Sequence, residues 1–181
     1  MKSTTYSGVR VELTRGDIAN QPDCDAVVNA ANARLQMGGG VAGAIHRGAG
    51  PGLEEETRPL APIRPGEAVI TGGHHLPNDY VIHCLGPIYG QDEPADTLLA
   101  DCYRNALMLA RENGIQHIAF PSISTGAFGY PMEMAARIAL QTVKESIPEL
   151  TAVKTIRFVL WGERAMQVHE TALKEAFGES N

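Results

Sequence analysis

The sequence predicts an α/β protein, a three-layer αβα sandwich around a central mixed, mostly parallel sheet. Short apolar segments rich in β-formers alternate along the chain with longer amphipathic helical patterns, as in proteins whose helices cover both faces of a sheet. The length of 181 residues suits one domain over residues 1–181, and the 44% hydrophobic and 20% charged residues are ordinary globular composition.

The strands are recognised by short apolar or alternating runs that end at turn residues. Residues 9–13 alternate, residues 26–30 read as a buried strand, and Pro121 ends the apolar run before it. Gly72-Gly73, interpreted as a simple turn, separates two β-rich runs. The predicted strands are 9–13, 26–30, 67–71, 80–85, 118–120 and 156–160.

The helices are recognised by apolar residues that recur on one helical face. Residues 95–113 show this spacing most clearly, and Gly114 follows as a stop signal. Pro148 and Gly178 follow two further patterns. The predicted helices are 41–49, 95–113, 132–146 and 165–177.

Charge and composition exclude several classes of function. The net charge of −6 argues against a broad basic face for duplex nucleic acid, so neutral backbone donors would have to hold any anionic ligand. The chain has no apolar run near the roughly 20 residues of a membrane span, and its first residues resemble no signal peptide. Three widely spaced cysteines (Cys24, Cys84, Cys102) are typical of reduced core thiols. We therefore expect a cytoplasmic monomer, bacterial in style, that needs no metal and no cofactor.

Two glycine-rich segments follow predicted strands. Residues 38–43 come after the strand at 26–30, and residues 124–129 come after the strand at 118–120. Glycine lets the backbone approach a ligand closely, successive N–H groups can form an anion-binding nest, and a helix that begins after the first segment adds its positive end. Because the carboxyl ends of parallel strands share an edge, two facing loops would suit a diphosphate.

Taken alone, the first segment leaves alternatives open. Glycine clusters are often only turns, and Gly38-x-Gly40-x-x-Gly43 also fits a dinucleotide-binding fingerprint. The acidic residue expected about 20 positions later is missing, because the chain there reads Arg58-Pro59-Leu60-Ala61-Pro62. A nicotinamide-dependent oxidoreductase is therefore disfavoured.

Four segments together resemble the macrodomains that bind ADP-ribose, in particular the MacroD-type branch. They are Gly16-Asp17-Ile18; Val28-Asn29-Ala30-Ala31-Asn32 with Gly38–His46; Tyr80–His83 with Gly86-Pro87; and Ser124–Pro131. The resemblance covers the chain from about Val9 to Phe177.

The resemblance implies a role for each matching residue. Asp17 would accept a hydrogen bond from the adenine amine beside the Ile18 backbone, and Trp161 would pack on adenine. Without the resemblance, Asp17 reads as a turn residue and Trp161 as a core or rim residue. Asn32 would hold the distal ribose. The diphosphate and distal ribose would lie between Gly39, Gly40, Val41 and Ala42 on one side and Ser124, Thr125, Gly126, Ala127 and Phe128 on the other. Phe128 has a competing role as a core wedge.

One position departs from the branch, whose hydrolases usually carry aspartate where this chain has Ala42. Alanine cannot orient or activate water. Two hypotheses follow: a hydrolase of mono-ADP-ribose esters, on Asp or Glu side chains or in O-acetyl-ADP-ribose, that relies on Asn32 and the substrate's own phosphate; or a reader that binds ADP-ribose or an ADP-ribosylated protein without turnover. Glu54, Glu55 and Glu56 are expected on a solvated face.

The histidines are interpreted as structural. His46 is expected to cap or pack a short helix, and His83 to be a hydrogen-bonded core residue. The remaining histidines, expected at the surface or in loops, are His74, His75, His117 and His169.

Overall fold

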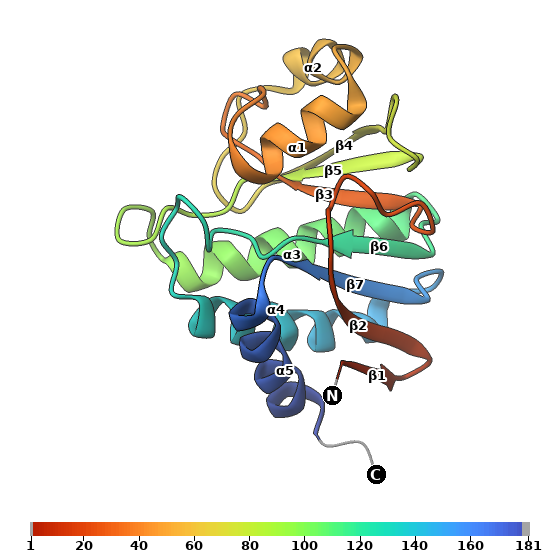
Figure 1. Cartoon of the computed structure of the whole chain (residues 1–181), viewed down its shortest axis with the longest axis vertical. Helices are drawn as coiled ribbons and strands as arrows, with labels where there is room; N and C mark the ends of the chain where they lie inside the picture. Colours follow the sequence, from red (N-terminus) through yellow and green to blue (C-terminus); the bar gives the residue numbers. More distant parts are fainter. Residues whose placement is uncertain (1, 179–181) are drawn as a thin grey trace.

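The computed structural model, which describes residues 2–178, contains a seven-stranded sheet of order β1-β2-β7-β6-β3-β5-β4 (Figure 1). The five central strands are parallel to one another, and β1 and β4 pair antiparallel at the edges. The predicted mixed, mostly parallel sheet is thereby confirmed. The strands are β1 (Ser3–Tyr6), β2 (Val9–Arg15), β3 (Ala26–Ala30), β4 (Ala68–Gly72), β5 (Tyr80–Cys84), β6 (His117–Phe120) and β7 (Thr155–Leu160).

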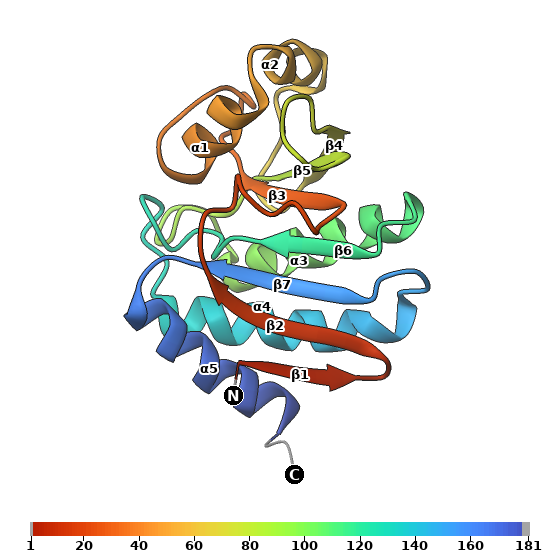
Figure 2. The ribbon, with the colours of Figure 1, turned by 45° about the vertical axis from the view of Figure 1, so that its right-hand side comes forward.

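Helices cover both faces of the sheet (Figure 2). The helices are α1 (Gly40–Ala49), α2 (Gly52–Thr57), α3 (Ala95–Glu112), α4 (Met132–Ser146) and α5 (Glu163–Phe177), with 3-10 turns η1 (Arg58–Leu60) and η2 (Ile147–Glu149). Successive strand residues face opposite sides of the sheet. Val28 and Ile82 belong to the core that includes residues of α3, α4 and α5, whereas Val27 and Val81 belong to the core that includes residues of α1 and α2.

One strand and one α-helix were not predicted from the sequence. The segment Ser3–Tyr6 forms β1, although it lacks apolar alternation, because β2 supplies its backbone partners. Helix α2 spans only six residues, too few for a helical period to be recognised.

His169 corrects a prediction, because it is fully buried in α5 rather than at the surface. Helix α5 begins at Glu163, and the 3.6-residue period places His169 on the same buried face as Ala165 and Leu173. Its Nδ1 donates to the carbonyl of Ala165 at 2.8 Å. Burial lowers the pKa of this imidazole.

The three cysteines are buried free thiols, as predicted. Burial raises the pKa of Cys24 to about 11 and that of Cys102 to about 12. Within residues 2–178, no helix combines the length and the apolarity needed to cross a bilayer.

Candidate functional site

A cleft of about 620 Å³ opens at the carboxyl ends of the parallel strands. The loop after β2, the start of α1, the loop after β6 and the residue after β7 form its walls. Its lining is Gly16, Asp17, Ile18, Gly40, Val41, Ala44, Pro121, Ser122, Thr125, Gly126, Met132, Val159, Leu160, Trp161 and Ala165. This edge is where sheets of this type bind ligands.

The first glycine loop leads directly into α1. Gly39 is the N-cap, and no side chain caps this end of the helix. The N–H groups of Gly40, Val41 and Ala42 therefore remain available as donors, at the positive end of the helix. A Cβ on Gly43 would lie 2.6 Å from the carbonyl oxygen of Gly38, so the loop fits closely over the helix only because residue 43 is glycine.

The second loop has the geometry of an anion nest. Ser124 adopts φ +68° despite carrying a side chain, and its Oγ donates to the carbonyl of Pro87 at 2.8 Å. Thr125 Oγ1 donates to the carbonyl of Ser122 at 3.0 Å and stabilises the turn. Among residues 2–178, no group accepts a hydrogen bond from the backbone N–H of Gly126, Ala127 or Phe128. The loop thus offers neutral donors to an anion.

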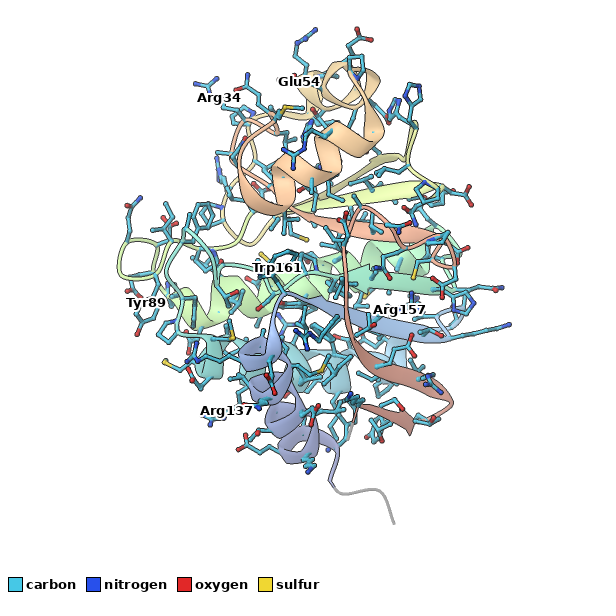
Figure 3. All side chains as sticks on the ribbon, in the orientation of Figure 1. Arg34, Glu54, Tyr89, Arg137, Arg157 and Trp161 are labelled. Atoms are coloured by element: carbon cyan, nitrogen blue, oxygen red, sulfur yellow. The ribbon has the colours of Figure 1, made fainter. Side chains whose placement is uncertain are left out.

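The loop after β2 and the end of β7 form the other end of the cleft. Asp17 is exposed, and its Oδ1 accepts a hydrogen bond from the N–H of Ala19 at 2.9 Å, so its turn role is confirmed. Ile18 beside it is buried. Trp161 is 89% exposed at the cleft rim, which excludes the core alternative and leaves a free aromatic face (Figure 3).

A chain of hydrogen bonds that the sequence did not reveal fixes Asp17. Gln21 Nε2 donates to the carbonyl of Asp17 at 2.9 Å, and Gln21 Oε1 accepts from Arg157 Nη1 at 2.9 Å. Arg157 also donates two hydrogen bonds to the carboxylate of Asp23, of 2.6 and 2.7 Å, and one to Glu12 at 2.8 Å. These bonds hold the pKa of the Asp23 carboxyl below its usual range. Arg157 of β7 thereby positions the whole loop after β2, a long-range relation that leaves no local sequence signal.

The polar side chain of Asn32 is already engaged. Its Nδ2 donates to the carbonyl of Gln36 at 2.8 Å, and its Oδ1 accepts from the N–H of Gln36 at 3.0 Å. A Cβ on Gly38 would lie 3.3 Å from Asn32 Nδ2, so the amide lies against the first glycine loop.

The structure divides the predicted site residues into two groups. Those that line the cleft are Asp17, Ile18, Gly40, Val41, Thr125, Gly126 and Trp161. Those that lie behind or beside this lining are Asn32, Gly39, Ala42, Ser124, Ala127 and Phe128. Ala42 is buried in α1, and Phe128 packs against the cluster that contains Leu35 and Leu85, which confirms its core role.

Apolar cleft residues were missed, including Met132 and Val159. Met132 is the first residue of α4, and its helical pattern had suggested a core position only.

The histidines and glutamates contribute little to the cleft. His83 is fully buried between Asn29 (3.1 Å) and Thr71 (2.9 Å), as predicted, and His46 is also buried. Glu56 is exposed as expected, but it accepts from the N–H of Gly72 and from His74. Asp17 is the one acidic residue of the described cleft lining. In the described part of the chain, no His, Cys, Asp or Glu side chains cluster as a metal site requires.

A family model described as the macro domain matches residues 28–139, which include both glycine loops. The chain belongs to the macrodomain family. Macrodomains of known structure share the whole architecture. An Oceanobacillus iheyensis macrodomain mutant with ADPR superposes with a TM-score of 0.92 at 37% identity and covers 98% of both chains. The Trypanosoma brucei macrodomain in complex with ADP-ribose gives a TM-score of 0.84 at 39% identity, over 90% of this chain and 68% of the other.

Curated macrodomain relatives are more similar in sequence. A macro domain-containing protein of Chlorobaculum tepidum is 49% identical over 166 residues, which cover 91% of this chain and 96% of the relative. The ADP-ribose glycohydrolase MACROD2 of Xenopus laevis is 46% identical over 171 residues, which cover 93% of this chain and 41% of that protein.

Proposed function

We propose that this macrodomain binds ADP-ribose in the cleft and hydrolyses mono-ADP-ribose esters, on Asp or Glu side chains of a protein or in O-acetyl-ADP-ribose. The observation that carries the proposal is the pair of loops with free backbone donors, one on α1 and one after β6, at the same edge of the sheet. Solved macrodomains that hold ADP-ribose, at 39% identity, support the same ligand here.

The ligand follows the cleft from Trp161 toward Asn32. Adenine stacks on the exposed indole and donates its amine hydrogen to Asp17, since a carboxylate only accepts. The diphosphate accepts hydrogen bonds from the N–H groups at the start of α1 and from the loop after β6. Asn32 holds the distal ribose. Its Nδ2 carries two hydrogens, so one can bond the ribose while the other keeps the bond to Gln36.

The reaction proposed for the ester is water attack on the anomeric carbon of the distal ribose. The new C–O bond forms as the bond to the acyl oxygen breaks, and the released carboxylate keeps the electron pair. The attacking water loses its proton through the diphosphate to solvent. A carboxylate is a good leaving group, so the protein supplies position and electrostatic stabilisation rather than an acid.

A peptide mono-ADP-ribosylated on glutamate tests the proposal. The parent protein is expected to release ADP-ribose, and Asn32→Ala is expected to release much less while keeping its melting temperature within a few degrees. Asn32→Asp is the matched variant, because it keeps the size of the side chain but not its N–H donors. Release at equal rates by all three proteins would contradict a role for Asn32.

One observation favours the second candidate, a reader without turnover. With alanine at position 42, the first turn of α1 contains no carboxylate that could activate water. Under that alternative, Ala42→Asp gains activity that the parent and Ala42→Asn both lack. A parent that turns over efficiently would exclude the pure reader.

A nicotinamide-dependent oxidoreductase gains no support. The fingerprint glycines lie well beyond the end of β3 instead of in a tight turn directly after it. We further propose a cytoplasmic monomer of one domain, residues 1–181, that acts on ADP-ribosylated protein. Met1 and residues 179–181 lie outside the described residues. Light scattering at assay concentration tests the monomer.

A further inference from the structure

A second, smaller hollow of about 150 Å³ lies along the loop that follows β3, and one of its lining residues, Gln36, is hydrogen-bonded to Asn32. Arg34, Gln36, Glu54, Thr57, Arg58 and Ala61 line it. Arg34 and Glu54 lie at the end of the molecule formed by α1 and α2, away from Trp161 (Figure 3). The hollow is therefore near the ribose end of the proposed ligand and far from the adenine end.

Backbone bonds connect the hollow to the site. Gln36, which lines the hollow, holds both polar atoms of the Asn32 side chain through its own backbone. The loop between them is fixed, because Leu35 is fully buried at φ +57° and its carbonyl accepts from Thr57 Oγ1 at 2.9 Å. Arg34 thus projects from a preformed turn, which lowers the entropic cost of binding.

The arginines of this hollow are free to bind a ligand. In the part of the chain that the structure describes, neither Arg34 nor Arg58 forms an ion pair or a side-chain hydrogen bond. Arg104, Arg137 and Arg157 have carboxylate partners. Within residues 2–178, the unpaired arginines also include Arg15, Arg47, Arg64 and Arg111, and what distinguishes Arg34 and Arg58 is that both line the same hollow. Unpaired guanidiniums that line one hollow in a chain of net charge −6 indicate an anionic ligand from outside the chain.

We propose that this hollow binds an aspartate or glutamate side chain that flanks the modified residue of the target protein. The inference rests on the proposed function, since the polypeptide of an ADP-ribosylated protein leaves the site next to Asn32. Two guanidiniums bind the flanking carboxylate, and Met37, half-exposed on the same loop, contacts the passing peptide. Glu54 on the wall of the hollow opposes the carboxylate and limits its affinity.

The test uses two peptides with one ADP-ribosylated glutamate, flanked by aspartates in one and by asparagines in the other. The measured quantity is the ratio of their kcat/KM values, or of their Kd values where no turnover occurs. The parent is expected to favour the aspartate peptide about fivefold. Arg34→Gln/Arg58→Gln is expected to abolish this preference, and Glu54→Gln to increase it.

Arg111→Gln/Lys154→Gln is the matched control. It removes the same charge from exposed positions at the end of α3 and just before β7, far from the cleft edge. Equal kcat/KM or Kd values of the parent for the two peptides would overturn the proposal. It would also be overturned if the control variant lost the preference for the aspartate peptide as fully as the Arg34/Arg58 variant. A preference that survives in the Arg34/Arg58 variant would also overturn it. Binding of free ADP-ribose distinguishes failure of this inference from failure of the proposed function. All variants should bind free ADP-ribose as tightly as the parent. If the parent itself does not bind free ADP-ribose, the proposed function is wrong.

Discussion

A Cβ added to Gly86 would lie 2.1 Å from Ser124 Oγ, closer than any real contact. Ser124 cannot easily move away, because it is buried with φ +68° and its Oγ donates a hydrogen bond to the carbonyl of Pro87. The N–H of Tyr89 also donates to the carbonyl of Phe128 at 2.9 Å. The segment after β5 therefore holds the second glycine loop in place.

We expect Gly86→Ala to displace that loop. The overpacking should lower the free energy of unfolding by about 1–3 kcal/mol and weaken ADP-ribose binding about tenfold. Gly126→Ala is the comparison, since a Cβ there meets nothing within 4 Å. It should leave stability near that of the parent while crowding the ligand. Urea unfolding and calorimetric titration measure both effects, and a Gly86→Ala protein with unchanged affinity would contradict the bracing role.

Trp161 is expected to act on binding and not on folding. At 89% exposure it contributes little to the core, so Trp161→Ala should change the free energy of unfolding by less than about 0.5 kcal/mol. Loss of base stacking should weaken ADP-ribose binding by roughly 1–3 kcal/mol. Trp161→Tyr should retain most of the affinity, because it keeps an aromatic face. Affinity equal to the parent in Trp161→Ala would place adenine elsewhere.

Arg157 should affect both stability and binding, although it does not line the cleft. Arg157→Lys keeps the charge but loses the paired bonds to Asp23 and the bond to Gln21. The expected cost is on the order of 1–3 kcal/mol of stability, together with weaker ADP-ribose binding as the Asp17 loop loosens. Arg10→Lys is the control, because Arg10 bonds the same Glu12 from an exposed position and should change little. Equal effects of the two substitutions would refute the special position of Arg157.

Acid is expected to destabilise the fold through His83. Burial, with a smaller effect from His46, lowers the pKa of His83 to about 3, and burial also lowers the pKa values of His46 and His169. The neutral ring fits its site, since Nδ1 accepts from Asn29 and Nε2–H donates to Thr71. In the unfolded chain His83 takes up a proton near pH 6.5. The stability that the neutral ring contributes is therefore fully present above pH 6.5 and is lost as the pH falls toward 3.

The slope should approach about 1.4 kcal/mol per pH unit for each such proton. Urea unfolding at pH 7, 6 and 5 measures it, and His83→Gln should flatten the dependence. The pKa of the Asp23 carboxyl lies below its usual range, so the stability that Asp23 contributes is lost only below about pH 4, outside the measured range from pH 7 to pH 5. A parent with constant stability from pH 7 to pH 5 would contradict the buried neutral histidine.

Periodicity predicted the central strands and the long helices because their apolar residues point into one of two cores. Val27 and Val28 illustrate this, since the alternation along β3 faces the two helical layers. Strand β1 could not be predicted, because β2 and not its own side chains determines its pairing. The prediction of His169 at the surface was wrong. Histidine is polar, but the 3.6-residue period of α5 places it on the buried face.

Glycine position predicted the two loops of the site, because free N–H groups and positive φ are local properties of the chain. The supports of those loops were not predictable, since each is a contact between distant segments. Arg157 reaches Gln21 and Asp23 from the other end of the sequence, and Ser124 fits only against Gly86. The role of Asn32 at the distal ribose is a prediction from the resemblance, whereas its hydrogen bonds to Gln36 required the structure.

Calorimetric titration of the full chain with free ADP-ribose tests the central claim most directly. Backbone donors of the two loops should give saturable binding with one site per chain, lost in part when Trp161 is replaced by alanine. ADP is expected to bind as well, and ribose 5-phosphate, which lacks the adenine and the diphosphate, much more weakly. Absence of any heat with ADP-ribose at millimolar concentration would contradict the account.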